Sequence, residues 1–190
     1  MNRLTDRNNF IDIENYNLAY IARRCDYVQI KKKLEYKERE ILLMHLGGII
    51  IECFVKDKIV KNNNIKKTRG NKFWYSESAF NYISGINNPK KEDFKEKATL
   101  INPNHDIREG IKSINISSKD LIDEDKNIDR CIDVIQTPFK EFDFDGNGYE
   151  KIEFIDLRYL SSDEFPNIKD VFDNWEKSFR YLHKWLIDMD

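Results

Sequence analysis

The sequence lacks the long apolar runs and the excess of one charge that mark membrane proteins and many nucleic-acid-binding proteins. Its 190 residues include 32 lysines and arginines against 34 aspartates and glutamates, a formal net charge of −2. A nearly neutral chain has no global electrostatic attraction to DNA or to an anionic membrane. No apolar stretch approaches the roughly 18 residues that span a bilayer, and residues 1–6 lack the apolar core of a signal peptide. We therefore expect a soluble, cytoplasmic protein that does not bind membranes.

Cysteine and histidine, the usual ligands of zinc, are also scarce. The cysteines, Cys25, Cys53 and Cys131, are odd in number and widely spaced, without the paired arrangement of a zinc site. We expect reduced thiols, and neither a metal nor another cofactor. The chain has three histidines: His45, His105 and His183. Acid–base chemistry by imidazole near neutral pH would have to use one of these.

The residues that are abundant indicate long amphipathic helices. Charged residues make up 35% of the chain and hydrophobic ones 40%, whereas about 25% charged is usual. Helices with solvated outer faces account for that excess, and a chain of this length is sufficient for one domain with a buried core. We predict one mainly α domain over residues 1–190, an antiparallel bundle of four to five helices.

The segment 37–60 is apolar almost all round in its middle. A helix with that pattern lies at the centre of a bundle. Gly47 and Gly48 would each weaken the helix by roughly 1 kcal/mol, unless close packing against a neighbour requires them. We therefore predict that this second helix is the centre of the fold.

The other helices are placed by their apolar stripes and capping residues. A first helix is expected over 12–34, and its apolar stripe is Leu18, Ile21, Cys25 and Val28. Asn104 should cap a third helix that ends at residue 114, and Ser118 should cap a fourth. The last helix, from about Pro166, should bury residues at helical spacing: Ile168, Phe172, Trp175, Phe179, Leu182 and Leu186.

Segments without helical periodicity separate these helices. Residues 62–72 are expected to form a polar, basic loop, and residues 73–101 an irregular region with aromatic anchors. Residues 139–157 are predicted to form a small β-hairpin, because the glycines and the asparagine of residues 145–148 suit its turn.

Three short segments, in this order along the chain, resemble those of one protein family. The first, residues 47–56, has two glycines and then Glu52 and Lys56 at successive helical turns. The second is His105-Asp106-Ile107-Arg108, and the third is Leu157-Arg158-Tyr159. Over about residues 12–188 the chain is thereby similar to the HEPN superfamily, the nucleotide-binding and RNase-like helical modules of bacterial toxin and defence systems.

This resemblance implies a component of a bacterial antiviral defence or toxin–antitoxin system. Relatives commonly form two-fold dimers and often act with a nucleotidyltransferase. A homodimer, or a partner protein from the same operon such as a nucleotidyltransferase, an ATPase or a nuclease, is therefore expected. The expected function is binding of nucleic acid, of a nucleotide or of that partner.

The arginine–histidine pattern of the family's RNases is not matched. Active members carry an arginine followed four to six residues later by a histidine, late in the chain. Here Arg180 and His183 are only three residues apart, on one face of the last helix. Arg39 and His45 have the right spacing, but they belong to the second helix and lie on different faces of it. We therefore expect little catalysis.

The alternative function is that of a metal-independent RNase toxin. Such cleavage needs one group that takes the proton of the 2′-hydroxyl and another that stabilises negative charge, and these roles suit histidine and arginine. The candidate catalytic residues are Arg180, His183, His105 and Arg158.

Structural roles compete with catalysis at each candidate. We favour a core contact for His45, a capping role for His105 and packing for His183. For Glu52 and Lys56 we favour a buried ion pair within the bundle. Arg158 and Tyr159 either clamp a phosphate and stack on a base or hold the hairpin on the bundle, and the sequence leaves both open.

A local excess of basic residues lies between Lys56 and Lys72, with seven basic side chains against one acid. Phe73, Trp74 and Tyr75 follow directly, and basic groups beside aromatic rings suit single-stranded nucleic acid. The candidate nucleic-acid-binding residues are Lys66, Lys67, Arg69, Lys72 and Tyr159. A solvated loop with an aromatic anchor is the favoured alternative.

Residues 143–154 resemble the first half of a calcium-binding EF-hand loop. Asp143, Asp145, Asn147 and Gly148 occupy the first positions of that pattern. The closing glutamate is missing, because Phe154 occupies its position. We favour a simple turn over a third possible function, a calcium-responsive module.

Overall fold

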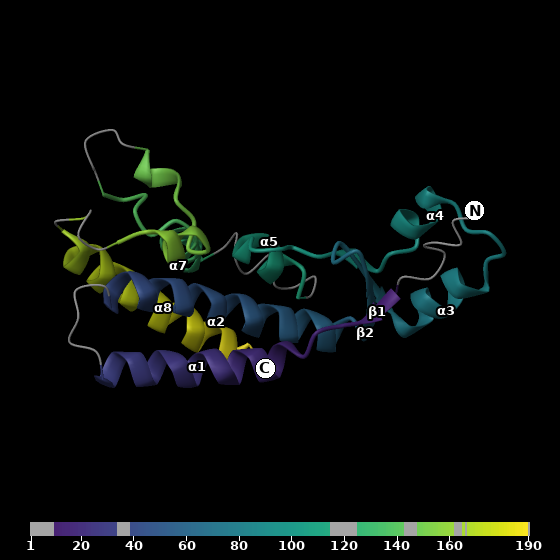
Figure 1. Cartoon of the computed structure of the whole chain (residues 1–190), viewed down its shortest axis with the longest axis horizontal. Coiled ribbons are helices and arrows are strands. Elements are labelled where there is room, and N and C mark those ends of the chain that lie inside the picture. Colours follow the sequence, from purple (N-terminus) through teal and green to yellow (C-terminus); the bar gives the residue numbers. More distant parts are fainter. Residues whose placement is uncertain are drawn as a thin grey trace, which may run out of the picture.

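The fold is built around α2 (Arg39–Asn62), which contacts most of the other elements. The computed structural model describes residues 10–33, 39–114, 125–142, 148–161, 165 and 167–189. Beside α2 lie α1 (Tyr16–Lys33) and α8 (Ile168–Asp188), and Figure 1 shows these long helices at one end of an elongated molecule. The expectation of a mainly α fold with a small β component is confirmed.

The central position of α2 depends on its two glycines. A Cβ atom on Gly47 would lie 2.2 Å from Cη2 of Trp175, and one on Gly48 would lie 2.2 Å from Cδ2 of Phe154. No real Cβ tolerates such a distance, so both rings rest directly on the helix backbone. Close packing therefore explains why a helix of the core contains consecutive glycines.

The predicted buried stripe of α1 is wrong. Leu18, Ile21 and Val28 are 62%, 47% and 42% exposed, and Cys25 is exposed as well. The side chains that α1 buries are three tyrosines: Tyr16, Tyr20 and Tyr27. Their large rings bury more area than aliphatic side chains do, and their hydroxyls can reach polar partners on other helices.

The α8 prediction is confirmed at its main positions. Its buried side chains include Phe172, Trp175, Phe179, Leu182 and Leu186. Trp175 and Phe179 stack in parallel with ring centroids 5.0 Å apart. The apolar stripe of α8 therefore faces α2 and α7, and most of the side chains on its outer surface are polar.

A four-stranded antiparallel sheet occupies the region that the sequence predicted to be loop and irregular structure. Its order is β1 (Phe10–Asp12), β2 (Ile65–Arg69), β3 (Phe73–Ser76) and β4 (Leu100–Ile101). The predicted loop at 62–72 is therefore wrong, and so is the helix start at residue 12, because that residue pairs with β2. Gly70 and Asn71, both at positive φ, make the tight reversal between β2 and β3.

Two short helices cover the outer face of this sheet (Figure 1). They are α3 (Glu77–Gly85) and α4 (Lys91–Glu96), and they enclose a second small core of Tyr75, Ile83 and Phe94. The opposite face of the sheet presents Trp74 to the main core. The sheet thus separates two cores, and its inner face meets the helical part.

The two helices that directly follow the sheet in the described part of the chain are capped by aspartates. Asp106 caps α5 (Ile107–Lys112) by accepting a hydrogen bond from the Glu109 amide, so the predicted cap at Asn104 is wrong. Asp125 caps α7 (Lys126–Gln136). The predicted cap at Ser118 falls outside the described residues. The buried stripe of α7 includes Ile128, Ile132 and Ile135.

The hairpin predicted at 139–157 is also corrected. Its described residues, 139–142 and 148–157, contain no strand and include the 3-10 helix η1 (Tyr149–Lys151) and the start of η2 (Asp156–Tyr159). Phe139 and Phe154 are fully buried, and Phe139 stacks on Phe165. Aromatic side chains packed into the core, rather than a strand ladder, hold the described part of this segment. No helix in the described part of the chain is long and apolar enough to cross a bilayer.

We predict that Gly48→Ala lowers the free energy of unfolding by about 1–3 kcal/mol, because the added methyl group overlaps the Phe154 ring. Gly85→Ala is the matched control, since a Cβ at that position meets no atom within 4 Å. Stability of the control should be unchanged or raised by up to about 1 kcal/mol. Urea denaturation of both variants measures this, and equal stabilities would contradict the packing argument.

Candidate functional site

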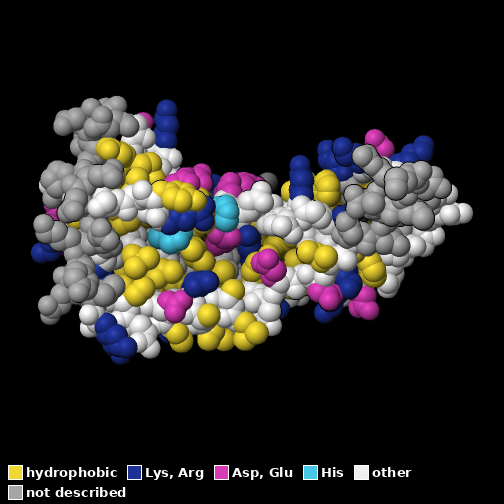
Figure 2. Space-filling model, viewed as in Figure 1, with side chains coloured by type: hydrophobic (Ala, Val, Ile, Leu, Met, Phe, Trp, Pro, Cys, Tyr) yellow, Lys and Arg dark blue, Asp and Glu magenta, His cyan; other side chains and the backbone are white. Residues whose placement is uncertain are grey.

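A polar cavity of about 320 Å³ lies where the helical part meets the inner face of the sheet. Residues from α1, α2, the sheet and the segment before α5 line it, among them Glu14, Tyr16, Glu52, Lys56, Thr68, Trp74 and His105. In Figure 2, histidine, acidic and basic side chains gather near the middle of this face of the molecule. We call this space the junction cavity.

Glu52 and Lys56 form the buried ion pair that the sequence predicted. The Lys56 Nζ atom lies 2.6 Å from Glu52 Oε1, and their side chains are only 8% and 12% exposed. Their spacing of four residues places both on one face of α2. The Lys56 ammonium also lies over the Tyr16 ring, 5.5 Å from its centroid. One turn of α2 therefore presents a charged pair to the cavity.

His105 completes this group, and its predicted capping role is wrong. Its Nδ1 lies 2.9 Å from Glu52 Oε2, so the carboxylate bonds to both the lysine and the imidazole. When the ring is neutral and donates from Nδ1, Nε2 is left as a proton acceptor. A buried carboxylate that orients an imidazole in this way is an arrangement that supports general base catalysis.

The loop that carries His105 is held by α7. The Gln136 side chain donates to the His105 carbonyl oxygen at 3.1 Å and accepts from the Ile107 amide at 3.0 Å. Arg108 bonds to Asp129 and Asp133 of the same helix. Residues 105–108, the second segment of the resemblance, thus pack against α7. This places His105 beside Glu52, which belongs to the first segment.

Thr68 of β2 lines the junction cavity and carries a buried hydroxyl. The residue is only 4% exposed, and its Oγ1 has no hydrogen-bond partner within the described residues. An unpaired buried hydroxyl costs about 1–3 kcal/mol. A ligand that supplied a hydrogen bond would remove this cost.

Cys53 and Tyr16 also line the cavity, and both side chains are held in their neutral form. Burial, with the nearby Glu52 carboxylate, raises the pKa of the Cys53 thiol to about 11. Burial also raises the pKa of Tyr16, and Glu14 adds to that shift. The thiol is therefore protonated near neutral pH and is a weak nucleophile.

The structure does not bring Arg180 and His183 together as a catalytic pair. His183 Nε2 lies 3.0 Å from the Tyr20 hydroxyl, and its ring stacks on Phe179. Arg180 points to Glu176, with Nη2 3.2 Å from Oε2. Burial lowers the pKa of His183, and the charge of Arg24 lowers it further. These contacts agree with the packing role favoured for His183.

The other candidate residues lie outside the junction cavity. His45 Nδ1 lies 2.9 Å from the Phe154 carbonyl oxygen, which agrees with a structural contact. Arg158 and Tyr159 are exposed on η2, with the guanidinium 4.7 Å from the centre of the tyrosine ring. Among the described residues, no carboxylate pairs with Arg158.

The basic residues predicted to bind nucleic acid do not form one surface. Lys67 pairs with Asp12 at 2.6 Å, and the Arg69 guanidinium lies 3.3 Å from the centre of the Phe94 ring. Both therefore cover the second small core, whereas Lys66 and Lys72 are exposed. Trp74 and Tyr75 are buried, so neither can stack on the bases of a nucleic acid bound at the outer surface.

Three of the four residues that carry the EF-hand-like pattern, Asp143, Asp145 and Asn147, lie outside the described residues. The residue at its closing position, Phe154, is fully buried in the main core. Gly148 has φ 76°, which agrees with the predicted turn. Across the described part of the chain, no three His, Cys, Asp or Glu side chains cluster closely enough to hold a metal ion.

Sequence reasoning missed Thr68 as a site residue because it treated residues 62–72 as a loop. One signal was present: Gly70-Asn71 between β-branched and aromatic residues is a hairpin pattern. Comparisons with models of known families, with curated proteins and with solved structures find no match.

The lowered pKa of His183 gives a test of its packing role. Its imidazole is harder to protonate in the folded chain than in the unfolded chain, where the pKa is about 6.5. The neutral, buried imidazole therefore makes its full contribution to the free energy of unfolding above about pH 6.5. This contribution is lost as the pH falls below that value. We predict a smaller loss of unfolding free energy between pH 7.5 and pH 5 in His183→Gln than in the wild type. Urea denaturation at both pH values measures it, and parallel losses would refute the burial argument.

Proposed function

We propose that this chain is a HEPN-like binding component that holds a nucleoside or nucleotide in the junction cavity, with little catalysis of its own. The observation that supports this proposal is the hydrogen bond between Glu52 and His105. It connects residues 47–56 with residues 105–108, the first two segments of the resemblance, at one polar cavity. The volume of about 320 Å³ lies at the lower end of the usual range for ligand sites.

The chemistry of the lining favours a nucleoside over an extended nucleic acid. Thr68, Asn71 and Asn104 offer hydroxyl and amide groups, which both donate and accept hydrogen bonds as base edges and ribose hydroxyls require. The cavity has no surplus of positive charge, because Lys56 is neutralised by Glu52 and Glu14 lies nearby. A row of phosphates would find no set of cations there.

The biological setting is carried by the family resemblance. We place the chain in the cytoplasm, in a bacterial defence or toxin–antitoxin system. Its partner would be a protein from the same operon, such as a nucleotidyltransferase, an ATPase or a nuclease. Nucleotide binding would then be the signal that this component passes to its partner.

Thr68→Val tests the proposal, because it removes only the unpaired hydroxyl and keeps the shape of the side chain. We expect calorimetry with a panel of nucleosides and nucleoside mono-, di- and triphosphates to find a ligand for the wild type. The variant should bind that ligand about tenfold more weakly, which corresponds to about 1.4 kcal/mol. Its own stability should be unchanged or higher, since an unsatisfied buried group is gone.

Thr99→Val is the matched control for this experiment. The Thr99 hydroxyl accepts a hydrogen bond from the Ser76 amide at 2.7 Å and does not line the cavity. This control should lose stability and keep ligand affinity, the reverse of Thr68→Val. The proposal fails if no compound of the panel binds, or if both variants bind as the wild type does.

A metal-independent RNase remains the second candidate, and the orientation of His105 by Glu52 is the observation that favours it. Among the described residues that line the cavity there is no arginine, and the charge of Lys56 is already paired. Stabilisation of the transition-state charge is therefore weak. This is why we assign little catalysis to the chain.

We predict little or no cleavage when the isolated chain is incubated with RNA in EDTA. Any genuine activity should be lost in His105→Ala and retained in His183→Ala, because only His105 lies beside an orienting carboxylate within the cavity. Gel analysis of a labelled RNA measures this. Robust cleavage that depends on His105 would show that the chain is an RNase rather than a binding component. Cleavage that depends on His183 would refute the assignment of the site to the junction cavity.

A further inference from the structure

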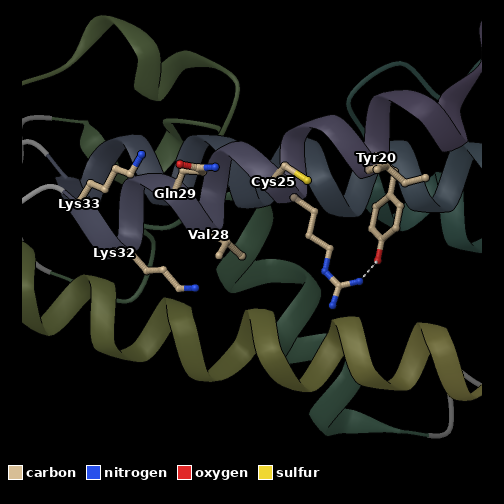
Figure 3. A pocket seen from close by; sticks show the side chains of 8 residues that line it. Tyr20, Cys25, Val28, Gln29, Lys32 and Lys33 are labelled. Carbon is tan, nitrogen blue, oxygen red and sulfur yellow. Dashed lines mark hydrogen bonds between the residues drawn. The ribbon is translucent and has the colours of Figure 1, made fainter.

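The outer face of α1 is an apolar groove that no other described element covers. A space of about 510 Å³ runs along it, and every described residue that lines it belongs to α1, from Tyr20 to Lys33. Figure 3 shows Val28 and Lys32 extending from α1 toward the side on which α8 lies. Nη1 of Arg24 lies 3.5 Å from the Tyr20 hydroxyl. The groove ends at this point, because Tyr20 is one of the tyrosines that pack α1 against the bundle.

The exposed apolar residues of this face have the spacing of a helix-pairing seam. Leu18, Ile21, Cys25 and Val28 follow one another at intervals of three, four and three residues. That is the spacing of the two apolar positions of a heptad, whose side chains insert between those of a facing helix. The opposite side of α1 is already occupied, since its tyrosines pack into the bundle. The seam formed by Leu18, Ile21, Cys25 and Val28 is therefore a second face of α1 on which a helix could pack.

The charge beside the seam is positive. Arg24, Lys32 and Lys33 line the groove, and no acidic side chain is among its described lining residues. In heptad terms Arg24 lies next to the seam, where ion pairs with a facing helix form. A complementary helix would therefore present one carboxylate beside its apolar stripe, opposite Arg24, and another at the end of the stripe, opposite Lys32.

A second copy of this chain fits the seam poorly. An antiparallel pair of α1 helices would bring the two Arg24 side chains together near the centre of the seam. A parallel pair would place Lys32 opposite Lys32. Both arrangements set like charges beside each other without a carboxylate between them, which opposes association.

We propose that the outer face of α1 binds an amphipathic helix of a partner protein, with apolar residues at heptad spacing flanked by aspartate or glutamate. This interaction is independent of the junction cavity. The apolar residues would pack on Ile21, Cys25 and Val28, and the carboxylates would pair with Arg24 and Lys32. The mode is that of a helix bound along a hydrophobic groove.

The test uses two synthetic helical peptides with leucine at the heptad core positions, one flanked by glutamate and the other by lysine. Fluorescence anisotropy with the full chain should show binding of the glutamate peptide only, weakening as salt is added. Val28→Glu should reduce its affinity about tenfold or more. Ile101→Glu is the matched control, because Ile101 is equally exposed but lies on β4, and it should bind as the wild type does.

Alkylation of the cysteines gives a second readout. Cys25 is exposed on the seam, whereas Cys53 is buried. The glutamate peptide should slow alkylation of Cys25 and leave that of Cys131 unchanged.

Several results would overturn the proposal. These are absence of binding by the glutamate peptide, equal binding of both peptides, and unchanged affinity in Val28→Glu. Light scattering that shows a dimer lost in Val28→Glu would assign the seam to a second copy instead. Binding to vesicles with anionic lipid that is lost in Val28→Glu, without peptide binding, would assign it to a membrane.

Discussion

The direct contact of two aromatic rings with the backbone of α2 is the constraint on which the rest of the structure depends. Trp175 rests on Gly47 and Phe154 on Gly48, so α8 and the segment that contains Phe154 approach the central helix more closely than any side chain there would allow. Such packing has little freedom to adjust, because protein interiors are dense. The positions of both segments follow from it.

The candidate site is tied to the same contact through the backbone of Phe154. Its amide donates to the Gln136 carbonyl oxygen at 2.9 Å. The Gln136 side chain in turn holds the carbonyl of His105, and His105 reaches Glu52 one turn beyond the glycines. A packing contact in the core therefore sets the position of an imidazole at the cavity. Glu52 is the buried member of this chain of contacts, and a buried carboxylate stabilises the fold only when its partners are in place.

The first helix serves both surfaces to which we assign binding. Tyr16 lies at the junction cavity, and Tyr20 closes one end of the outer groove. The three tyrosines attach α1 to the bundle by their rings and hydroxyls, as the contact of Tyr20 with His183 illustrates. The aliphatic side chains of the same helix are thereby left on the outside. The tyrosine face of α1 therefore borders the ligand site, and the aliphatic face of the same helix forms the proposed partner surface.

Local sequence determined those features that depend on a single strong pattern. The apolar run around Gly47 and Gly48 was sufficient to place α2 at the centre, and the stripe through Trp175 was sufficient to orient α8. The Glu52–Lys56 pair followed from their spacing of four residues on a helix expected to be buried.

Tertiary structure decided the features for which two local patterns compete. In α1 an aliphatic stripe and a tyrosine stripe both repeat at helical spacing, and only the polar partners on other helices, such as His183, select the tyrosines. The sheet depends on pairing between residues far apart in sequence, as Ile11 pairs with Thr68. Such strands are short and gain their stability from neighbours that a local pattern does not reveal. Thr68 and His105 became site residues in the same way, because the junction cavity exists only where α2, the sheet and the loop before α5 meet.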